Sequence, residues 1–328
     1  MSRPCPVNLT RFVTLPIAVF VLAVSAGSQS NPYREVENWP QLPANLKLGA
    51  VISVDVDPKG NIWVFHRNQP PILELDRVVK RFGGLLAVSD VSFDVGQGEI
   101  VSMIGPNGAG KTTAFNCITG LYPLTAGDVR FDGYSLVGLP PHRITRMGIS
   151  RTFQNIRLFS YMTAVDNVMV GEHCRMRSKV WDDLLHTRKE RKEERAVEAR
   201  ALAMLRKLGL ERYADVYARN LPYGLQRRLE IARALASGPT LLLLDEPAAG
   251  LNPQEKVELM GVISGLRKEG LTIFLIEHDM RVVMGISDRI VVLDHGEKIT
   301  EGKPAAVRSN PQVIEAYLGQ GAAERMAT

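Results

Sequence analysis

The sequence predicts an α/β fold in which helices flank a mostly parallel sheet. Apolar runs typical of buried strands end in polar loops, as in EIVSMI (99–104), LLLLDEP (241–247) and TIFLIEHD (272–279). The first run leads directly into GPNGAGKTT (105–113), and a helical pattern, KTTAFNCITGLY, overlaps its end. A strand, a glycine-rich loop and a helix in this order are typical of α/β folds that bind phosphate groups.

Composition sets broad limits on the fold and on the partners. The chain has 328 residues, 45% of them apolar, which suffices for one large domain or two ordinary ones. Its three cysteines, Cys5, Cys117 and Cys174, have no disulfide or metal-ligand spacing and are interpreted as free thiols in a reducing compartment. The net charge of +5 arises within residues 175–207, which hold 11 Lys or Arg against six Asp or Glu. Charges of both signs at helical spacing favour a solvated helix there, then a membrane or partner contact, over nucleic-acid binding.

The front of the chain, residues 1–27, resembles a secretory signal. Arg3 and Arg11 precede an uncharged apolar run from Phe12 to Ala26, and small residues follow. The run is shorter than the roughly 20 residues that a membrane span requires. An uncleaved anchor and a mistaken start codon remain as alternatives.

Residues 28–71 predict a linker followed by an isolated β-hairpin. AVISVDVDPKGNIWVFHR (50–67) alternates apolar and polar residues on both sides of a turn at Asp57, Pro58 and Gly60. The stretch weakly resembles part of a propeller blade of the NHL-repeat type. Since a propeller needs about four blades or more, this hairpin has no expected function of its own.

From Ile72 onward the chain carries the chemistry, and the loop at 105–113 has the pattern G-x-x-x-x-G-K-[ST]. Backbone N–H groups of such a loop and the start of the next helix form a cradle for phosphate. Lys111 supplies a cation for the phosphates, and the Thr112 hydroxyl is placed to bind Mg²⁺. The predicted phosphate-binding residues are Gly105, Pro106, Asn107, Gly108, Ala109, Gly110, Lys111, Thr112 and Thr113.

Four further residues predict what happens to the bound phosphates. Asp245 ends an apolar strand and is expected to hold Mg²⁺ through water, while Glu246 comes next. Strand alternation points Glu246 away from Asp245, where it could orient an attacking water. His278 follows another apolar strand. Gln154 lies in ISRTFQNIRLF, between the loop 105–113 and the strand that ends at Asp245.

Together, six ordered motifs from about Ile72 to Gly319 resemble the ATP-binding subunits of ABC transporters: Walker A, Gln loop, signature, Walker B, D-loop and His loop. KRFGGLLAV, RTFQNIRLF, YGLQRRLEIARAL, LLLLDEPAAGLNP, IEHDMRVVMGISDRI and NPQVIEAYLG resemble the branched-chain amino acid importers most closely. The resemblance implies a P-loop NTPase fold with an inserted helical subdomain, and ATP and Mg²⁺ as cofactors.

The resemblance also implies roles for single residues. Phe82 matches the aromatic residue that stacks on adenine, although plain packing is an equal alternative for a lone phenylalanine. Gln154 matches the residue that senses Mg²⁺ and couples to the membrane subunits. Glu246 matches the catalytic base and His278 the contact to the γ-phosphate.

The signature motif, which caps the ATP held by the partner subunit, corresponds to Leu221, Pro222, Tyr223 and Gly224. The usual pattern is L-S-G-G-Q. Here Pro222 lacks the hydroxyl and N–H donors of serine, and Leu225 replaces a polar residue. Gly224 keeps a backbone N–H for the γ-phosphate, so we expect a working fold with an altered site across the dimer.

The implied function is an ATP-hydrolysing subunit of an importer for branched-chain amino acids or similar small polar solutes. Its expected partners are an identical or different second ATP-binding subunit, separate transmembrane permease subunits and, indirectly, a solute-binding protein; no nucleic acid is expected. The expected location is peripheral, on the cytoplasmic face of the inner or plasma membrane. Alternatives are a lipid or lipopolysaccharide exporter subunit, an ABC ATPase of repair or translation, and a secreted β-rich module joined to an ATPase.

The expected domains are therefore 1–27 (signal-like), 28–71 (linker and hairpin), 72–320 (ATPase) and 321–328 (tail). The helical subdomain is expected at about 157–237. A true secretory signal would carry the ATPase away from its ATP, so we interpret the front end as a fusion or gene-model artefact.

Overall fold

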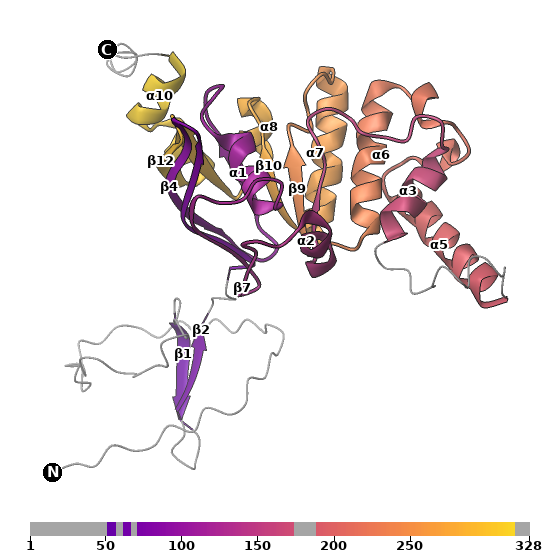
Figure 1. Ribbon diagram of the computed structural model, residues 1–328, viewed down its shortest axis with the longest axis horizontal. Coiled ribbons are helices and arrows are strands. Elements are labelled where there is room, and N and C mark those ends of the chain that lie inside the picture. Colours follow the sequence, from indigo (N-terminus) through magenta and orange to yellow (C-terminus); the bar gives the residue numbers. More distant parts are fainter. Residues whose placement is uncertain (1–50, 57–61, 67–70, 174–187, 319–328) are drawn as a thin grey trace, which may run out of the picture. The chain divides into compact units, whose positions relative to one another are not determined.

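The computed structural model describes residues 51–56, 62–66, 71–173 and 188–318 (Figure 1). The chain divides into two units, Met1–Gln69 and Pro70–Thr328. In the first unit, β1 (Val51–Val56) pairs antiparallel with β2 (Ile62–His66). The signal-like segment 1–27, the turn residues Asp57, Pro58 and Gly60, and the tail 321–328 lie outside the described residues.

A six-stranded sheet forms the centre of the second unit, in the order β12-β11-β5-β10-β9-β8. Its strands are β5 (Ile100–Ile104), β8 (Ile149–Arg151), β9 (Leu241–Asp245), β10 (Thr272–Ile276), β11 (Arg289–Asp294) and β12 (Glu297–Gly302). All neighbouring pairs are parallel except β11 and β12, which form a hairpin. The mostly parallel α/β sheet expected from the apolar runs is confirmed.

A second sheet of four antiparallel strands has the order β4-β3-β6-β7. These strands are β3 (Leu73–Phe82), β4 (Leu85–Val95), β6 (Ala126–Phe131) and β7 (Tyr134–Ser135). β4 begins with an exposed half, where Leu85 pairs with Phe82 of β3. Backbone pairing there extends the strand beyond the buried alternation.

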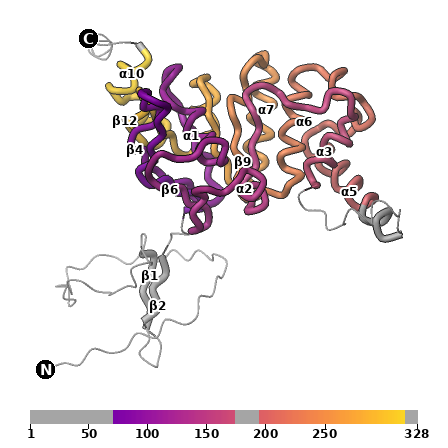
Figure 2. The backbone as a smooth tube through the Cα atoms, viewed as in Figure 1, coloured from indigo at the N-terminus to yellow at the C-terminus, as the bar shows by residue number. Residues whose placement is uncertain are grey.

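Helices cover the sheets and form a cluster at one end of the unit. They are α1 (Lys111–Ile118), α2 (Pro141–Met147), α3 (Ala164–Glu172), α5 (Arg188–Lys207), α6 (Tyr223–Ala236), α7 (Pro253–Lys268), α8 (Met280–Ile286), α9 (Pro304–Arg308) and α10 (Pro311–Leu318), with 3₁₀ turns η2 (Glu211–Tyr213) and η3 (Ala218–Asn220). Helices α3, α5 and α6 pack on one another at the end away from β4 and β12 (Figure 2). No helix among the described residues is long and apolar enough to cross a membrane.

The central strands are buried on both faces, in keeping with their mostly apolar sequences. Successive side chains of a strand point to opposite faces, so one strand serves two cores. Leu242 and Leu244 of β9 pack into the core shared with the helical cluster. Leu241 and Leu243 pack into the core beneath α1 and the antiparallel sheet.

Parallel pairing brings the carboxyl ends of four strands to one edge of the sheet. Ile276 of β10 lies beside Asp245 of β9 and Met103 of β5, and Arg151 of β8 pairs with Leu243. Loops that follow parallel strands at this edge are where α/β folds place their binding sites. The predicted site residues at 105–113, 154, 245–246 and 278 all follow these strand ends.

Candidate functional site

The loop after β5 is shaped by glycines that no other residue could replace without strain. Gly105 and Gly110 have φ angles of 151° and 97°. A Cβ added at Gly105 would lie 2.1 Å from the carbonyl oxygen of Leu293, and one at Gly110 would lie 2.4 Å from that of Ala87. The loop is therefore curled and closely packed on its outer side, which leaves its N–H groups for the inner side.

Lys111 begins α1 and turns its ammonium group into this loop. Its Nζ donates to the carbonyl oxygens of Gly105, at 2.7 Å, and Pro106, at 2.8 Å. Burial lowers the pKa of Lys111, and the nearby carboxylates of Glu246 and Asp245 oppose that shift. The chain thus holds a cation within the loop, near two acidic residues.

Asp245, the last residue of β9, is almost fully buried and paired with an arginine. Its Oδ2 accepts a hydrogen bond from Arg151 at 2.7 Å, whereas its Oδ1 has no hydrogen-bond partner among the described residues. Burial raises the pKa of Asp245, and the contact with Arg151 opposes the rise. Arg151 also donates to Asn116 Oδ1 at 2.6 Å and Thr119 Oγ1 at 3.2 Å, so it joins β8 and β9 to the end of α1.

Glu246 brings the three expected catalytic residues together. Its Oε2 accepts a hydrogen bond from Gln154 Nε2 at 3.1 Å and lies 3.4 Å from His278 Nδ1. The strand ends at Asp245, and Glu246 has a left-handed φ of 46°. A turn of the backbone, and not the strand alternation assumed from the sequence, therefore separates the two carboxylates.

A cleft of about 500 Å³ collects most of the predicted nucleotide-binding residues. Its lining includes Phe82, Asn107, Gly108, Ala109, Gly110, Lys111, Thr112, Thr113, Gln154 and Glu246. Phe82 is 40% exposed, with Lys80 Nζ 4.7 Å from its ring centre and Tyr122 packed edge-on against it. A partly exposed aromatic ring at the cleft wall suits stacking on a base.

The signature residues are placed elsewhere. None of Leu221, Pro222, Tyr223 and Gly224 is among the residues that line the cleft. Pro222 precedes the first turn of α6 with a φ of −52°, a position where its missing N–H has no helical partner to lose. Gly224 lies against α7, since an added Cβ would come within 2.6 Å of Glu255 Oε1.

Several residues around the site were missed from the sequence. Arg151 is one, because a lone arginine beside a strand gives no signal of burial. His295 and Gly296 from the β11–β12 turn also line the cleft. Tyr317 of α10 has a hydrogen bond with the Gly105 backbone, although burial has the larger effect on its pKa and raises it.

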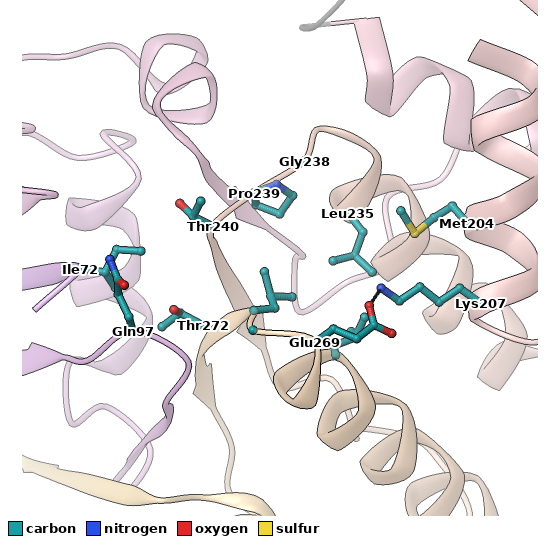
Figure 3. Close-up of a pocket in the computed structure, with 13 residues that line it drawn as sticks. Ile72, Gln97, Met204, Lys207, Leu235, Gly238, Pro239, Thr240, Glu269 and Thr272 are labelled. Atoms are coloured by element: carbon teal, nitrogen blue, oxygen red, sulfur yellow. Dashed lines mark hydrogen bonds and ion pairs between the residues drawn. The ribbon is translucent and has the colours of Figure 1, made fainter. Parts of the chain in front are cut away.

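A second cavity, of about 390 Å³, lies at the opposite edge of the sheet (Figure 3). Thr240 and Thr272, which line it, stand at the amino ends of β9 and β10. Lys207 and Glu269 form an ion pair at its wall. None of the predicted site residues is among the residues that line this cavity.

Comparison with known proteins places this arrangement in a family. Residues 88–249 match the family model described as "ABC transporter", and residues 297–323 match "Branched-chain amino acid ATP-binding cassette transporter". The chain is 50% identical over 251 residues to the "High-affinity branched-chain amino acid transport ATP-binding protein BraF" of Pseudomonas aeruginosa, covering 76% of this chain and 98% of that protein. It is 34% identical to the "Lipopolysaccharide export system ATP-binding protein LptB" of Escherichia coli, covering 76% and 97%.

Solved structures of ATP-binding cassettes are similar to this chain in fold. A crystal structure of the ADP conformation of an ATP-binding cassette from an ABC transporter has a TM-score of 0.68 and 33% identity, covering 77% of this chain and 100% of that one. A dimeric post-hydrolysis state of another cassette, bound to ADP and Pi, has a TM-score of 0.60 and 30% identity, covering 71% and 98%.

Proposed function

Because the chain belongs to the ATP-binding subunits of ABC transporters, we propose that it hydrolyses ATP to drive import of branched-chain amino acids. The single observation that carries the choice of substrate is the 50% identity to a branched-chain amino acid transport protein over 98% of its length. The lower identity of 34% to a lipopolysaccharide export protein makes that alternative weaker.

We propose that the loop 105–113 holds the phosphates of ATP through backbone N–H groups, with Lys111 as the cation. Lys111 already lies within the loop on two carbonyl oxygens, so binding requires only an exchange of acceptors. Phe82 stacks on the adenine from the wall of the same cleft.

Mg²⁺ fits the residues at this edge. The Thr112 hydroxyl and Gln154 belong to the cleft, and Asp245 has a buried carboxylate oxygen without a partner. Hard oxygen ligands of this kind suit Mg²⁺, which would neutralise charge on the phosphates when bound. Thr112, Gln154 and Asp245 are the residues that would hold it, directly or through water.

For hydrolysis we assign the base to Glu246. Its carboxylate is held between Gln154 and His278 and lines the cleft that contains the phosphate loop. It accepts the proton of an attacking water, while Gln154 fixes its orientation. His278, more than half exposed, remains free to contact the γ-phosphate.

ATP is proposed to bind between two subunits, either two copies of this chain or this chain and a related one. A similar cassette forms a dimer with ADP and Pi. Leu221, Pro222, Tyr223 and Gly224 do not line their own chain's cleft, which is consistent with a role at the partner's nucleotide. The dimer would work on separate permease subunits and indirectly with a solute-binding protein, at the cytoplasmic face of the membrane.

The function is proposed to reside in residues 72–320, with the helical subdomain at about 157–237. Contacts divide the chain near this boundary, between Gln69 and Pro70. The test compares the full chain with residues 71–328 for ATPase rate, melting temperature and location in the cell. A short form that is inactive or markedly less stable would make the front end part of the ATPase.

The transport function is tested with the purified chain, its permease subunits and a solute-binding protein in liposomes. ATP-dependent uptake of leucine is expected, and Lys111→Ala should abolish both ATP binding and uptake because the phosphates lose their cation. ATP hydrolysis stimulated by a lipid and not by leucine would favour the exporter. Unchanged nucleotide affinity in Lys111→Ala would refute the assignment of the phosphate loop.

A further inference from the structure

A fully buried arginine on α6 holds the segment that carries Gln154. Arg227 has no exposed surface, and its NH1 and NH2 groups donate to the carbonyl oxygens of Phe153 and Gln154, each at 2.8 Å. The same guanidinium donates to Glu230 Oε2 at 2.8 Å. Residues 153–157 are called the Gln loop here, and α6 the signature helix.

Glu230, one turn further along the signature helix, completes the attachment. Its Oε1 accepts hydrogen bonds from the backbone N–H groups of Phe153, at 3.3 Å, and Arg157, at 3.4 Å. One ion pair therefore serves four backbone groups of an irregular segment, two as donor and two as acceptor. Buried backbone groups outside helices and strands need such partners, and the planar fork of arginine suits two adjacent carbonyl groups.

The attachment reaches the catalytic group in one further step. The Gln154 carbonyl is held by Arg227, and the Gln154 side chain donates to Glu246. At the start of the signature helix, the Tyr223 hydroxyl lies 3.3 Å from Arg227 NH2, and its ring borders Gly250 beyond Glu246. The signature helix thus contacts Gln154, which donates to Glu246, and it also lies beside Gly250 in the loop that follows Glu246.

We propose that Arg227 and Glu230 are positioning residues, which lock the Gln loop to the signature helix so that Gln154 contacts Glu246 only when that helix is in place. The inference rests on the proposed function, in which Glu246 is the base and the signature residues contact the partner's nucleotide. A displacement of the signature helix then carries the Gln loop with it. Contact of the signature residues with the partner's nucleotide thereby changes the position of Glu246, which acts on the nucleotide bound by this chain.

The attachment itself is tested by hydrogen exchange of the full chain, without nucleotide. The double variant Arg227→Met with Glu230→Leu replaces the buried pair by apolar side chains of similar size, which proteins often tolerate. We expect peptides covering the Gln loop to exchange about tenfold faster or more, as for the loss of a hydrogen bond to a charged group. Peptides covering β9 and α7 should exchange at the wild-type rate.

Arg228→Gln is the matched control. Arg228 is the next residue of the same helix and pairs with Glu258 of α7, away from the Gln loop. Its loss should leave exchange of the Gln loop unchanged. Equal exchange of that loop in the wild type and the double variant, or equal acceleration by Arg228→Gln, would overturn the proposal.

The effect on Gln154 is read from kinetics. The double variant should lower kcat for ATP hydrolysis about tenfold or more, while the Kd of a fluorescent ATP analogue changes less than about twofold, because the phosphate loop is intact. Arg227→Lys keeps the positive charge but has fewer hydrogen-bond donors, so its kcat should lie between those of the double variant and the wild type. An unchanged kcat, or a loss shared equally between kcat and binding, would contradict a positioning role.

Two further outcomes are separable. If the double variant does not fold, Glu230→Gln and Arg227→Lys are measured in the same way, and each should accelerate exchange of the Gln loop. If the wild type fails to bind or hydrolyse ATP, the proposed function is wrong. Hydrogen exchange then still decides whether Arg227 and Glu230 hold the Gln loop.

Discussion

Replacing Arg151 by methionine should destabilise the ATPase unit by about 3–5 kcal/mol, the cost of removing one partner from a buried ion pair. Arg151 and Asp245 are 7% and 2% exposed and 2.7 Å apart. Since Asp245 Oδ1 has no partner, the change would leave a buried carboxylate with no hydrogen bond from Arg151 and none at its other oxygen. Asn116 and Thr119 would also lose a donor, which favours the upper half of that range.

The measurement is thermal unfolding followed by calorimetry. A domain of this size loses about 2–4 °C per kcal/mol, so Tm should fall by roughly 10 °C or more. Arg130→Met is the matched control, because Arg130 and Asp128 form an ion pair of similar length, 2.9 Å, but are partly exposed, and such pairs contribute at most about 1 kcal/mol.

A second variant isolates the charge left behind. Adding Asp245→Asn to Arg151→Met removes the unpaired carboxylate, so the double variant should melt above the single one. The reasoning is refuted if Arg151→Met is no more destabilising than Arg130→Met. It is also refuted if Asp245→Asn lowers the Tm of the Arg151→Met variant by as much as it lowers the Tm of the wild type.

Three other predictions concern single positions. Glu246→Gln should bind ATP normally but lower steady-state hydrolysis by about 10²–10⁴; near-normal turnover would contradict its role as base. Pro222→Ser with Leu225→Gln should raise turnover of the homodimer by supplying the missing donor, and equal rates would mean that the variant signature is harmless. Burial raises the pKa of Cys117 to about 11. With the other two cysteines replaced by serine, native protein at pH 8 should therefore react with iodoacetamide about 100-fold more slowly than unfolded protein, and equal rates would refute this burial.

The fold was predictable, and candidate nucleotide-binding residues could be proposed, because their signals are local. The phosphate loop is nine consecutive residues, 105–113, and it follows a mostly apolar run, while four consecutive leucines precede Asp245. Parallel strands bring their carboxyl ends together regardless of sequence separation, which explains why Gln154, Glu246 and His278 lie near one another in the structure. The ATP-binding family assignment and the α/β fold are confirmed by the comparisons.

The sequence did not indicate the buried arginines that form hydrogen bonds with Asp245 and with the backbone of Phe153 and Gln154. Arg151 and Arg227 are buried, whereas arginine is ordinarily found at the surface. Their partners, Asp245 for one and the backbone of Phe153 and Gln154 for the other, lie more than 70 residues away along the chain. Only tertiary packing creates such sites, so no local pattern announces them.

The strand order also governs how the protein is made. Among the described strands, β5, which leads into the phosphate loop, pairs with β10 and β11 alone, and both leave the ribosome long after it. The gap of about 170 residues between β5 and β10 takes roughly 10–30 s to synthesise at about 5–20 residues per second. During that interval a mostly apolar strand has neither of these neighbours, and the loop after it lacks its contacts with Leu293 and Gly296. A nascent chain therefore acquires nucleotide affinity only near the end of translation, and until then β5 is a natural substrate for chaperones.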